Sequence, residues 1–162
     1  MSDGGLTDAQ RHVARIVLTV AGPEGFHLAG GAALVASKLT NRPTRDIDAF
    51  TSKDVNVALV ADRVADALRD EGFEVEMSRR FDGFAELMVT AVGPRRSTFG
   101  VDLGRDYMEW PGTTTPLGPT LSPRELAASK VLALFGRVQT RDLADVAALV
   151  EHFPLEDMLA DA

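Results

Sequence analysis

Hydrophobic and polar positions along the chain follow two periods, and their order predicts a protein of mixed α and β structure. The first segment carries Val13, Ile16 and Val20 at helical spacing, and Thr7 with Gln10 forms a capping box at its start. Short apolar or alternating runs bounded by Gly and Pro predict strands. We therefore expect helices at Thr7–Ala21, Gly31–Leu39, Asp54–Glu71, Ser122–Gly136 and Arg141–His152, and strands at Phe26–Ala29, Asp46–Thr51, Phe73–Ser78, Ala85–Val92 and Thr98–Leu103.

This order of elements predicts an α+β fold in two layers, with a mixed sheet of about five strands, helices on one face and further helices at the C-terminal end. The 162 residues are enough for one domain with its own core. Within that single domain we expect an α/β core over residues 1–103, a loop rich in Pro, Gly and Thr over residues 104–121, and a helical part over residues 122–162.

Composition narrows the class of protein. The chain is 45% hydrophobic and 25% charged, as in soluble globular proteins, and it has no cysteine, which excludes disulfides and thiolate metal sites. No signal peptide and no membrane-spanning run is evident, so a cytoplasmic location is expected. The net charge of −7 argues against broad, sequence-blind nucleic-acid binding, although the doublets Arg79-Arg80 and Arg95-Arg96 leave a local basic patch open.

The most informative stretch runs from a buried strand through a Gly-Gly turn to a second strand. Strand alternation places Asp46 and Asp48 on one face and turns Ile47 into the core. Two neighbouring carboxylates repel each other unless a metal ion or an arginine lies between them. Gly30 and Gly31, at the start of a helix, offer backbone N–H groups to an anion. Together these features indicate metal–nucleotide chemistry.

A third acidic residue belongs to this pattern if two strands are neighbours. Asp102 lies between the apolar residues Val101 and Leu103, where a charge is costly unless it is paired. Beside the strand of Asp46 and Asp48, it would complete a carboxylate triad suited to Mg²⁺, with Mn²⁺ as an alternative. Two such ions could activate an attacking hydroxyl and stabilise a leaving pyrophosphate.

These motifs resemble the DNA polymerase β-type nucleotidyltransferase superfamily and, within it, the AbiEii-like and MenT-like toxins of type IV toxin–antitoxin systems. The resemblance spans about residues 26–150. The matching residues are Gly30–Leu34, Arg42–Asp48, Val101–Leu103 and, in the C-terminal part, Lys130, Arg141, Asp142 and Asp145.

The resemblance implies a polymerase β-type core and a set of site residues. Asp46, Asp48 and Asp102 would bind the metal ions, and Asp102 would help to deprotonate the acceptor hydroxyl. Lys130 would act in catalysis and contact the nucleotide. Many relatives have Gly-Ser where this chain has Gly30-Gly31. The nucleotide-binding residues implied are Gly30, Gly31, Arg42, Thr44, Lys130, Asp142 and Asp145, with the two acids across the cleft.

Each signal also has a purely structural interpretation. The Gly-Gly pair can be a tight turn, and Asp46 and Asp48 can form an ion-pair cluster with Arg42 and Arg45. Asp102 can end a strand at solvent. The remaining residues can be a lysine that reaches solvent and charges at a helix start, namely Lys130, Arg141, Asp142 and Asp145.

Three function classes follow. The first is a metal-dependent nucleotidyltransferase that moves a nucleoside monophosphate from an NTP to a hydroxyl of RNA, notably a tRNA 3′ end, or of a protein, as the toxin of a toxin–antitoxin pair with a cognate antitoxin. The second is a small-molecule nucleotidyltransferase, for which an acidic protein suits a cationic, aminoglycoside-like acceptor. The third is a non-catalytic nucleotide-binding or antitoxin module of the same fold.

Overall fold

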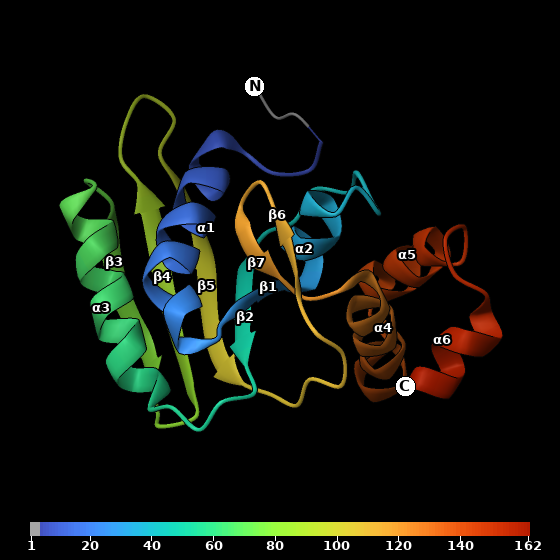
Figure 1. Cartoon of the computed structure of the whole chain (residues 1–162). Helices are drawn as coiled ribbons and strands as arrows, with labels where there is room; N and C mark the ends of the chain where they lie inside the picture. Colours follow the sequence, from blue (N-terminus) through green and yellow to red (C-terminus); the bar gives the residue numbers. More distant parts are fainter. Residues whose placement is uncertain (1–3) are drawn as a thin grey trace.

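The structure, a computed structural model, describes residues 4–162 and is organised around one mixed sheet (Figure 1). The seven strands lie in the order β3-β4-β5-β2-β1-β7-β6. Their bounds are β1 His27–Ala29, β2 Ile47–Thr51, β3 Glu74–Arg80, β4 Phe84–Ala91, β5 Ser97–Arg105, β6 Thr113–Thr115 and β7 Gly118–Thr120.

Most of the helices form two groups, and α2 lies between them in contact with β1, β2 and α4. In Figure 1, α1 and α3 cover one face of the sheet, and α4, α5 and α6 form a cluster beyond its β1–β7 side. No helix within residues 4–162 combines the length and the apolar character needed to cross a membrane. The bounds are α1 Asp8–Ala21, α2 Gly30–Ala36, α3 Val57–Asp70, α4 Pro123–Arg137, α5 Thr140–Leu149 and α6 Leu155–Asp161, with a short 3₁₀ turn at Gly22–Glu24.

The expected capping box of α1 is present and also supports the site. Thr7 Oγ1 accepts from the Gln10 amide at 3.2 Å, and the Gln10 side chain accepts from the Thr7 amide at 2.8 Å. The buried Gln10 side-chain nitrogen then donates to the Thr44 carbonyl at 2.9 Å. One side chain therefore caps the helix and holds the loop that leads into β2.

Strand β2 positions Asp48 between its two neighbouring strands, β1 and β5. It is antiparallel to β1 and parallel to β5, so Asp48 pairs in register with Ala29 on one side and with Asp102 on the other. Ile47 and Ala49 alternate with Asp48 and are fully buried on the face of β2 that α1 contacts. The opposite face of β2 is left for the acidic side chains.

Two details differ from the expectation. The sheet has seven strands, because the segment 104–121 is not a plain loop: β6 and β7 form a hairpin, and β7 pairs in parallel with β1 at Leu28 and Thr120. Three-residue strands show no alternation that a sequence pattern can detect, although their threonines favour strand structure. Helix α3 begins at Val57 because Asn56, which accepts from the Leu59 amide at 3.3 Å, is its cap.

Candidate active site

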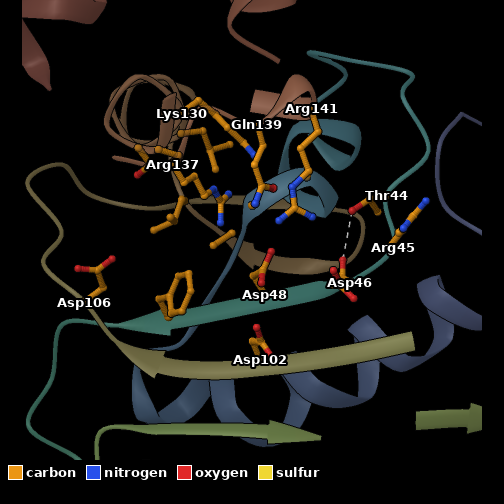
Figure 2. A pocket seen from close by; sticks show the side chains of 18 of the residues that line it. Thr44, Arg45, Asp46, Asp48, Asp102, Asp106, Lys130, Arg137, Gln139 and Arg141 are labelled. Atoms are coloured by element: carbon orange, nitrogen blue, oxygen red, sulfur yellow. Dashed lines mark hydrogen bonds between the residues drawn. The ribbon is translucent and has the colours of Figure 1, made fainter. Parts of the chain in front are cut away.

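Three carboxylates lie on the face of β2 and β5 that α1 and α3 leave uncovered. Asp48 and Asp102 are cross-strand neighbours, as expected if the two strands were adjacent. Asp46, which directly precedes β2, accepts a hydrogen bond from the Gly100 amide at 3.3 Å. All three line a cleft of about 1030 Å³ between the sheet and the C-terminal helices (Figure 2).

The carboxylates of Asp46, Asp48 and Asp102 form the acidic wall of the cleft. Burial and mutual repulsion disfavour the ionised forms of Asp48 and Asp102. Burial, and then the nearby Asp46 carboxylate, raises the pKa of Asp48. Burial followed by the charges of Asp48, Glu86 and Asp46 raises the pKa of Asp102 to about 6. Within residues 4–162 no lysine or arginine forms an ion pair with Asp46, Asp48 or Asp102. A divalent cation would relieve the repulsion.

The donor set fits a hard cation. The three side chains offer only carboxylate oxygens, which are the ligands that Mg²⁺ prefers. In the described part of the chain, however, no three acidic or imidazole groups come close enough to form a ready-made metal site. The wall therefore fits an ion that takes further oxygens from water and from a substrate phosphate.

Two glycines allow the backbone to approach this wall. Gly30 has a φ of +60°, and a Cβ at this position would overlap the Asp48 carboxylate. A Cβ at Gly31 would lie 2.8 Å from Thr44 Oγ1, which donates to the Asp46 carbonyl at 3.3 Å. The Thr44 hydroxyl thus occupies the space beside residue 31. Both glycines and Thr44 line the cleft.

The opposite wall of the cleft carries the cations Arg42, Lys130 and Arg137. Two fully buried aspartates of α5 hold these cations in place. Asp145 accepts two hydrogen bonds from the Arg42 guanidinium, both at 2.9 Å, and lies 2.9 Å from Lys130 Nζ. Asp142 accepts two from Arg137, at 2.9 and 3.1 Å, and lies 3.5 Å from Lys130 Nζ. Bidentate pairs of this kind fix both position and orientation.

This arrangement places Asp142 and Asp145 behind the cations. Neither aspartate lines the cleft, whereas Arg42, Lys130 and Arg137 do. The Arg137 hydrogen bonds hold the pKa of Asp142 below its ordinary value, and Asp145 raises the pKa of Arg42. Arg42 is therefore engaged by Asp145 rather than by Asp46 or Asp48, and the structural ion-pair interpretation of the two β2 acids is not what the structure shows.

Further cleft residues come from the end of α4, the α4–α5 turn and the start of α5. In Figure 2, Arg137, Gln139 and Arg141 extend toward Asp48 from the opposite wall. Arg141 forms no ion pair within residues 4–162, and its charge, with those of Lys130 and Arg137, opposes the rise in the pKa of Asp48. Sequence reasoning gave Arg137 no role; its spacing of seven from Lys130, which puts both on one helix face, was the available signal.

The fold resembles that of solved nucleotidyltransferases. JHP933 from Helicobacter pylori is similar over 96% of this chain and 73% of its own, with a TM-score of 0.73 and 19% identity. The nucleotidyltransferase toxin MenT4 from Mycobacterium tuberculosis H37Rv is similar over 92% and 60%, with a TM-score of 0.64 and 19% identity. ANT(2")-Ia, solved with adenylyl-2"-tobramycin, is similar over 94% of both chains, with a TM-score of 0.59 and 11% identity.

Family membership follows from the sequence itself. Residues 14–162 match the family described as nucleotidyl transferase AbiEii toxin of type IV toxin–antitoxin systems. The chain belongs to this family and is a nucleotidyltransferase of the toxin–antitoxin type. No curated protein sequence is significantly similar to it.

Proposed function

We propose that this enzyme transfers a nucleoside monophosphate from an NTP to a hydroxyl of RNA, with a tRNA 3′ end as the first acceptor to test and a protein as the alternative. The acceptor oxygen forms a bond to the α-phosphorus, the bond from that phosphorus to the β-phosphate oxygen breaks, and pyrophosphate leaves. The observation that carries the proposal is the cleft itself, in which three carboxylates that form no ion pair with any residue of the described range 4–162 face a wall of positioned cations.

The residues present fit divalent ions, Mg²⁺ or Mn²⁺, two of which would be held by Asp46, Asp48 and Asp102. Bound ions would supply charge neutralisation at the phosphates and a more acidic acceptor hydroxyl. Asp102, whose pKa is about 6, is ionised at neutral pH and suits the task of accepting the hydroxyl proton. Lys130, Arg137 and Arg141 would bind the phosphate oxygens from the opposite wall.

The N-terminal side of the cleft would hold the rest of the triphosphate. The backbone at Gly30 and Gly31 can approach the phosphates closely because neither residue carries a Cβ. Thr44 Oγ1 lies where it can take the part of the serine hydroxyl found in many relatives. Asp142 and Asp145 would then act as positioning residues for the cations rather than as ligands of the nucleotide.

A labelling experiment tests the proposal. Purified protein is mixed with each labelled NTP, Mg²⁺ or Mn²⁺, and total tRNA; we expect label on RNA, abolished by Asp48→Asn and by EDTA. Asp66→Asn, which removes an exposed acid on α3, is the matched control. Transfer that persists in Asp48→Asn, or no transfer with any NTP to tRNA or to protein, contradicts the proposal.

A small-molecule acceptor is the second candidate, and the likeness to ANT(2")-Ia over nearly the whole of both chains favours it. A net charge of −7 suits a cationic drug. Adding tobramycin to the same reaction decides between the two candidates, because label on the drug and none on RNA selects the small-molecule function.

Because the family is that of type IV toxins, we also propose that the chain has a cognate antitoxin as a partner. Expression of the chain should arrest growth, and expression of the Asp46→Asn variant should not. Co-expression of a neighbouring gene that restores growth would identify the antitoxin, whereas normal growth of cells that contain active wild-type protein would contradict the toxin role.

A further inference from the structure

We propose that the end of the cleft beyond Asp48 is a subsite for a nucleobase, built on the ring of Phe50 and rimmed by Tyr107. The inference rests on the proposed function in one respect, since it takes the cleft to bind a nucleotide. It adds the residues that would bind the base and thereby set substrate preference.

The floor of this subsite is Phe50. Strand alternation puts Phe50 on the same face of β2 as Asp48, roughly 7 Å further along the strand. Its cross-strand partner is Gly104, and a Cβ there would lie 3.0 Å from ring atoms Cδ1 and Cε1. The ring therefore lies against bare backbone. Phe50 is half-buried and lines the cleft, so it packs on the core and also offers surface to a ligand.

The rim is formed by Tyr107, which lies in the segment that directly follows β5. The Asp106 amide donates to the Thr51 carbonyl at 3.0 Å, which fixes the segment beside the residue that follows Phe50. Tyr107 lines the cleft, is 75% exposed, and donates its hydroxyl proton to the Glu109 carboxylate. A large exposed aromatic residue over a ligand cleft is a typical feature of base-stacking sites.

The far side of the segment is held by α4. The buried Glu125 carboxylate accepts from the Glu109 amide at 3.0 Å and from the Trp110 amide at 2.9 Å. The Trp110 ring in turn lies 4.4 Å below the Arg124 guanidinium. Tyr107 is thus presented by backbone that is fixed on both sides, and little ordering entropy would be lost when a ring stacks on it.

The chemistry of the lining distinguishes the two ends of the cleft. Thr44 and Arg45 lie beside Asp46 in Figure 2, where polar and cationic groups suit phosphate, whereas Phe50 lies further along β2, and the apolar residues Met108 and Leu121 also line the cleft. A flat ring with apolar faces and polar edges fits such a lining, and every nucleobase has those properties. The base can belong to the NTP or to the terminal nucleotide of an RNA acceptor, and the chemistry of recognition is the same.

Calorimetry tests the subsite. Wild type, Phe50→Leu, Tyr107→Phe and Tyr107→Ala are titrated in Mg²⁺ with each of the four NTPs and with inorganic tripolyphosphate. Stacking of one base contributes about 1–3 kcal/mol. Loss of the aromatic ring should therefore increase the dissociation constant roughly 5- to 150-fold. We expect this loss for the best-bound NTP in Phe50→Leu and Tyr107→Ala, with unchanged affinity for tripolyphosphate and wild-type behaviour of Tyr107→Phe.

The same variants identify the source of the base. If it comes from the acceptor, NTP affinities stay at wild-type values and the affinity for tRNA falls instead. Wild-type affinity of Phe50→Leu and Tyr107→Ala for both NTP and tRNA overturns the subsite while the proposed function stands. Wild-type protein that binds neither NTP nor tripolyphosphate overturns the proposed function and the subsite with it. Tyr107 is exposed, so Tyr107→Ala remains informative even if Phe50→Leu fails to fold.

Discussion

Replacing Asp102 with asparagine tests whether the acidic wall is a ligand site or a structural feature. The carboxylate is half-buried, lies beside Asp48 on the neighbouring strand β2 and pairs in register with Glu86 on β4. Burial first, and then the charges of Asp48, Glu86 and Asp46, raises its pKa from 3.8 to about 6, while Arg79 opposes the rise. Asparagine keeps the shape and removes the charge.

The magnitude and the sign follow from this pKa. A rise from 3.8 to about 6 corresponds to about 3 kcal/mol of lost stability for the ionised form, and solvent screening of a half-exposed group reduces this to roughly 1–2 kcal/mol. Between pH 4 and pH 6 the folded chain binds the proton more tightly than the unfolded chain does. The contribution of Asp102 therefore makes the protein more stable as the pH falls from about 7 to about 4.

Thermal unfolding measures the effect. In EDTA at pH 7.5, Asp102→Asn should melt roughly 2–8 °C higher than wild type, because 1 kcal/mol shifts the melting temperature of a chain of this size by about 2–4 °C. The gain should disappear near pH 4, where the wild-type carboxyl is protonated. Added Mg²⁺ should stabilise wild type more than the variant, and nucleotidyl transfer should be lost.

The opposite result would refute this reasoning. If Asp102 were held by the fold as one partner of a structural pair, Asp102→Asn would melt below wild type in EDTA and would not respond to pH in this range. Asp66→Asn controls for the removal of one negative charge, since Asp66 is 76% exposed and lies on α3 away from the cleft. An equal gain in that control would assign the effect to net charge.

Three further predictions concern the other parts of the cleft. Asp145→Asn should lower stability by about 3 kcal/mol in thermal or urea unfolding, because it leaves Arg42 without its buried carboxylate and Lys130 with Asp142 alone, at 3.5 Å; an unchanged midpoint contradicts this. Gly31→Ser should cost about 1–3 kcal/mol because its Cβ would meet the Thr44 hydroxyl, and Thr44→Ala in the same chain should restore the melting temperature. Arg141→Gln should leave the melting temperature nearly unchanged, since Arg141 has no ion pair within residues 4–162, and should weaken tripolyphosphate binding in calorimetry; wild-type affinity would remove Arg141 from the phosphate site.

Much of the fold could be predicted because its signals are local. The capping box at Thr7 and Gln10 and the alternation around Ile47 depend on neighbours in the chain, and both are found in the structure. The hairpin of β6 and β7 could not be predicted in this way. Each of its strands has three residues, and β7 is held to the sheet by pairing with β1, about ninety residues earlier in the chain.

The sequence indicated that the acidic residues would lie together and named Arg42 and Lys130, but it could not give the ion-pair partners of these cations. The pattern around Asp46 and Asp48 indicated one face, and the adjacency of Asp102 depended on a single strand pairing that the structure contains. The assignment of Asp142 and Asp145 depended on partners, and Arg42 and Asp145 are 103 residues apart. A sequence shows that a charge is present, whereas only the fold shows which opposite charge lies within hydrogen-bonding distance.

The aspartates near the cleft differ in the direction of their pKa shift, and this difference separates possible metal ligands from residues that position the cations. Arg137 lowers the pKa of Asp142, so that carboxylate is already stabilised as an anion and gains little from a cation in the cleft. Burial raises the pKa of Asp48, so that carboxylate is destabilised as an anion and gains from a cation in the cleft. A divalent ion should therefore stabilise the fold through Asp48 and Asp102 and leave the α5 pairs unchanged. Accordingly, the Mg²⁺-dependent increase in melting temperature should be smaller in Asp102→Asn than in wild type, and it should be retained, from a lower starting value, in Asp145→Asn.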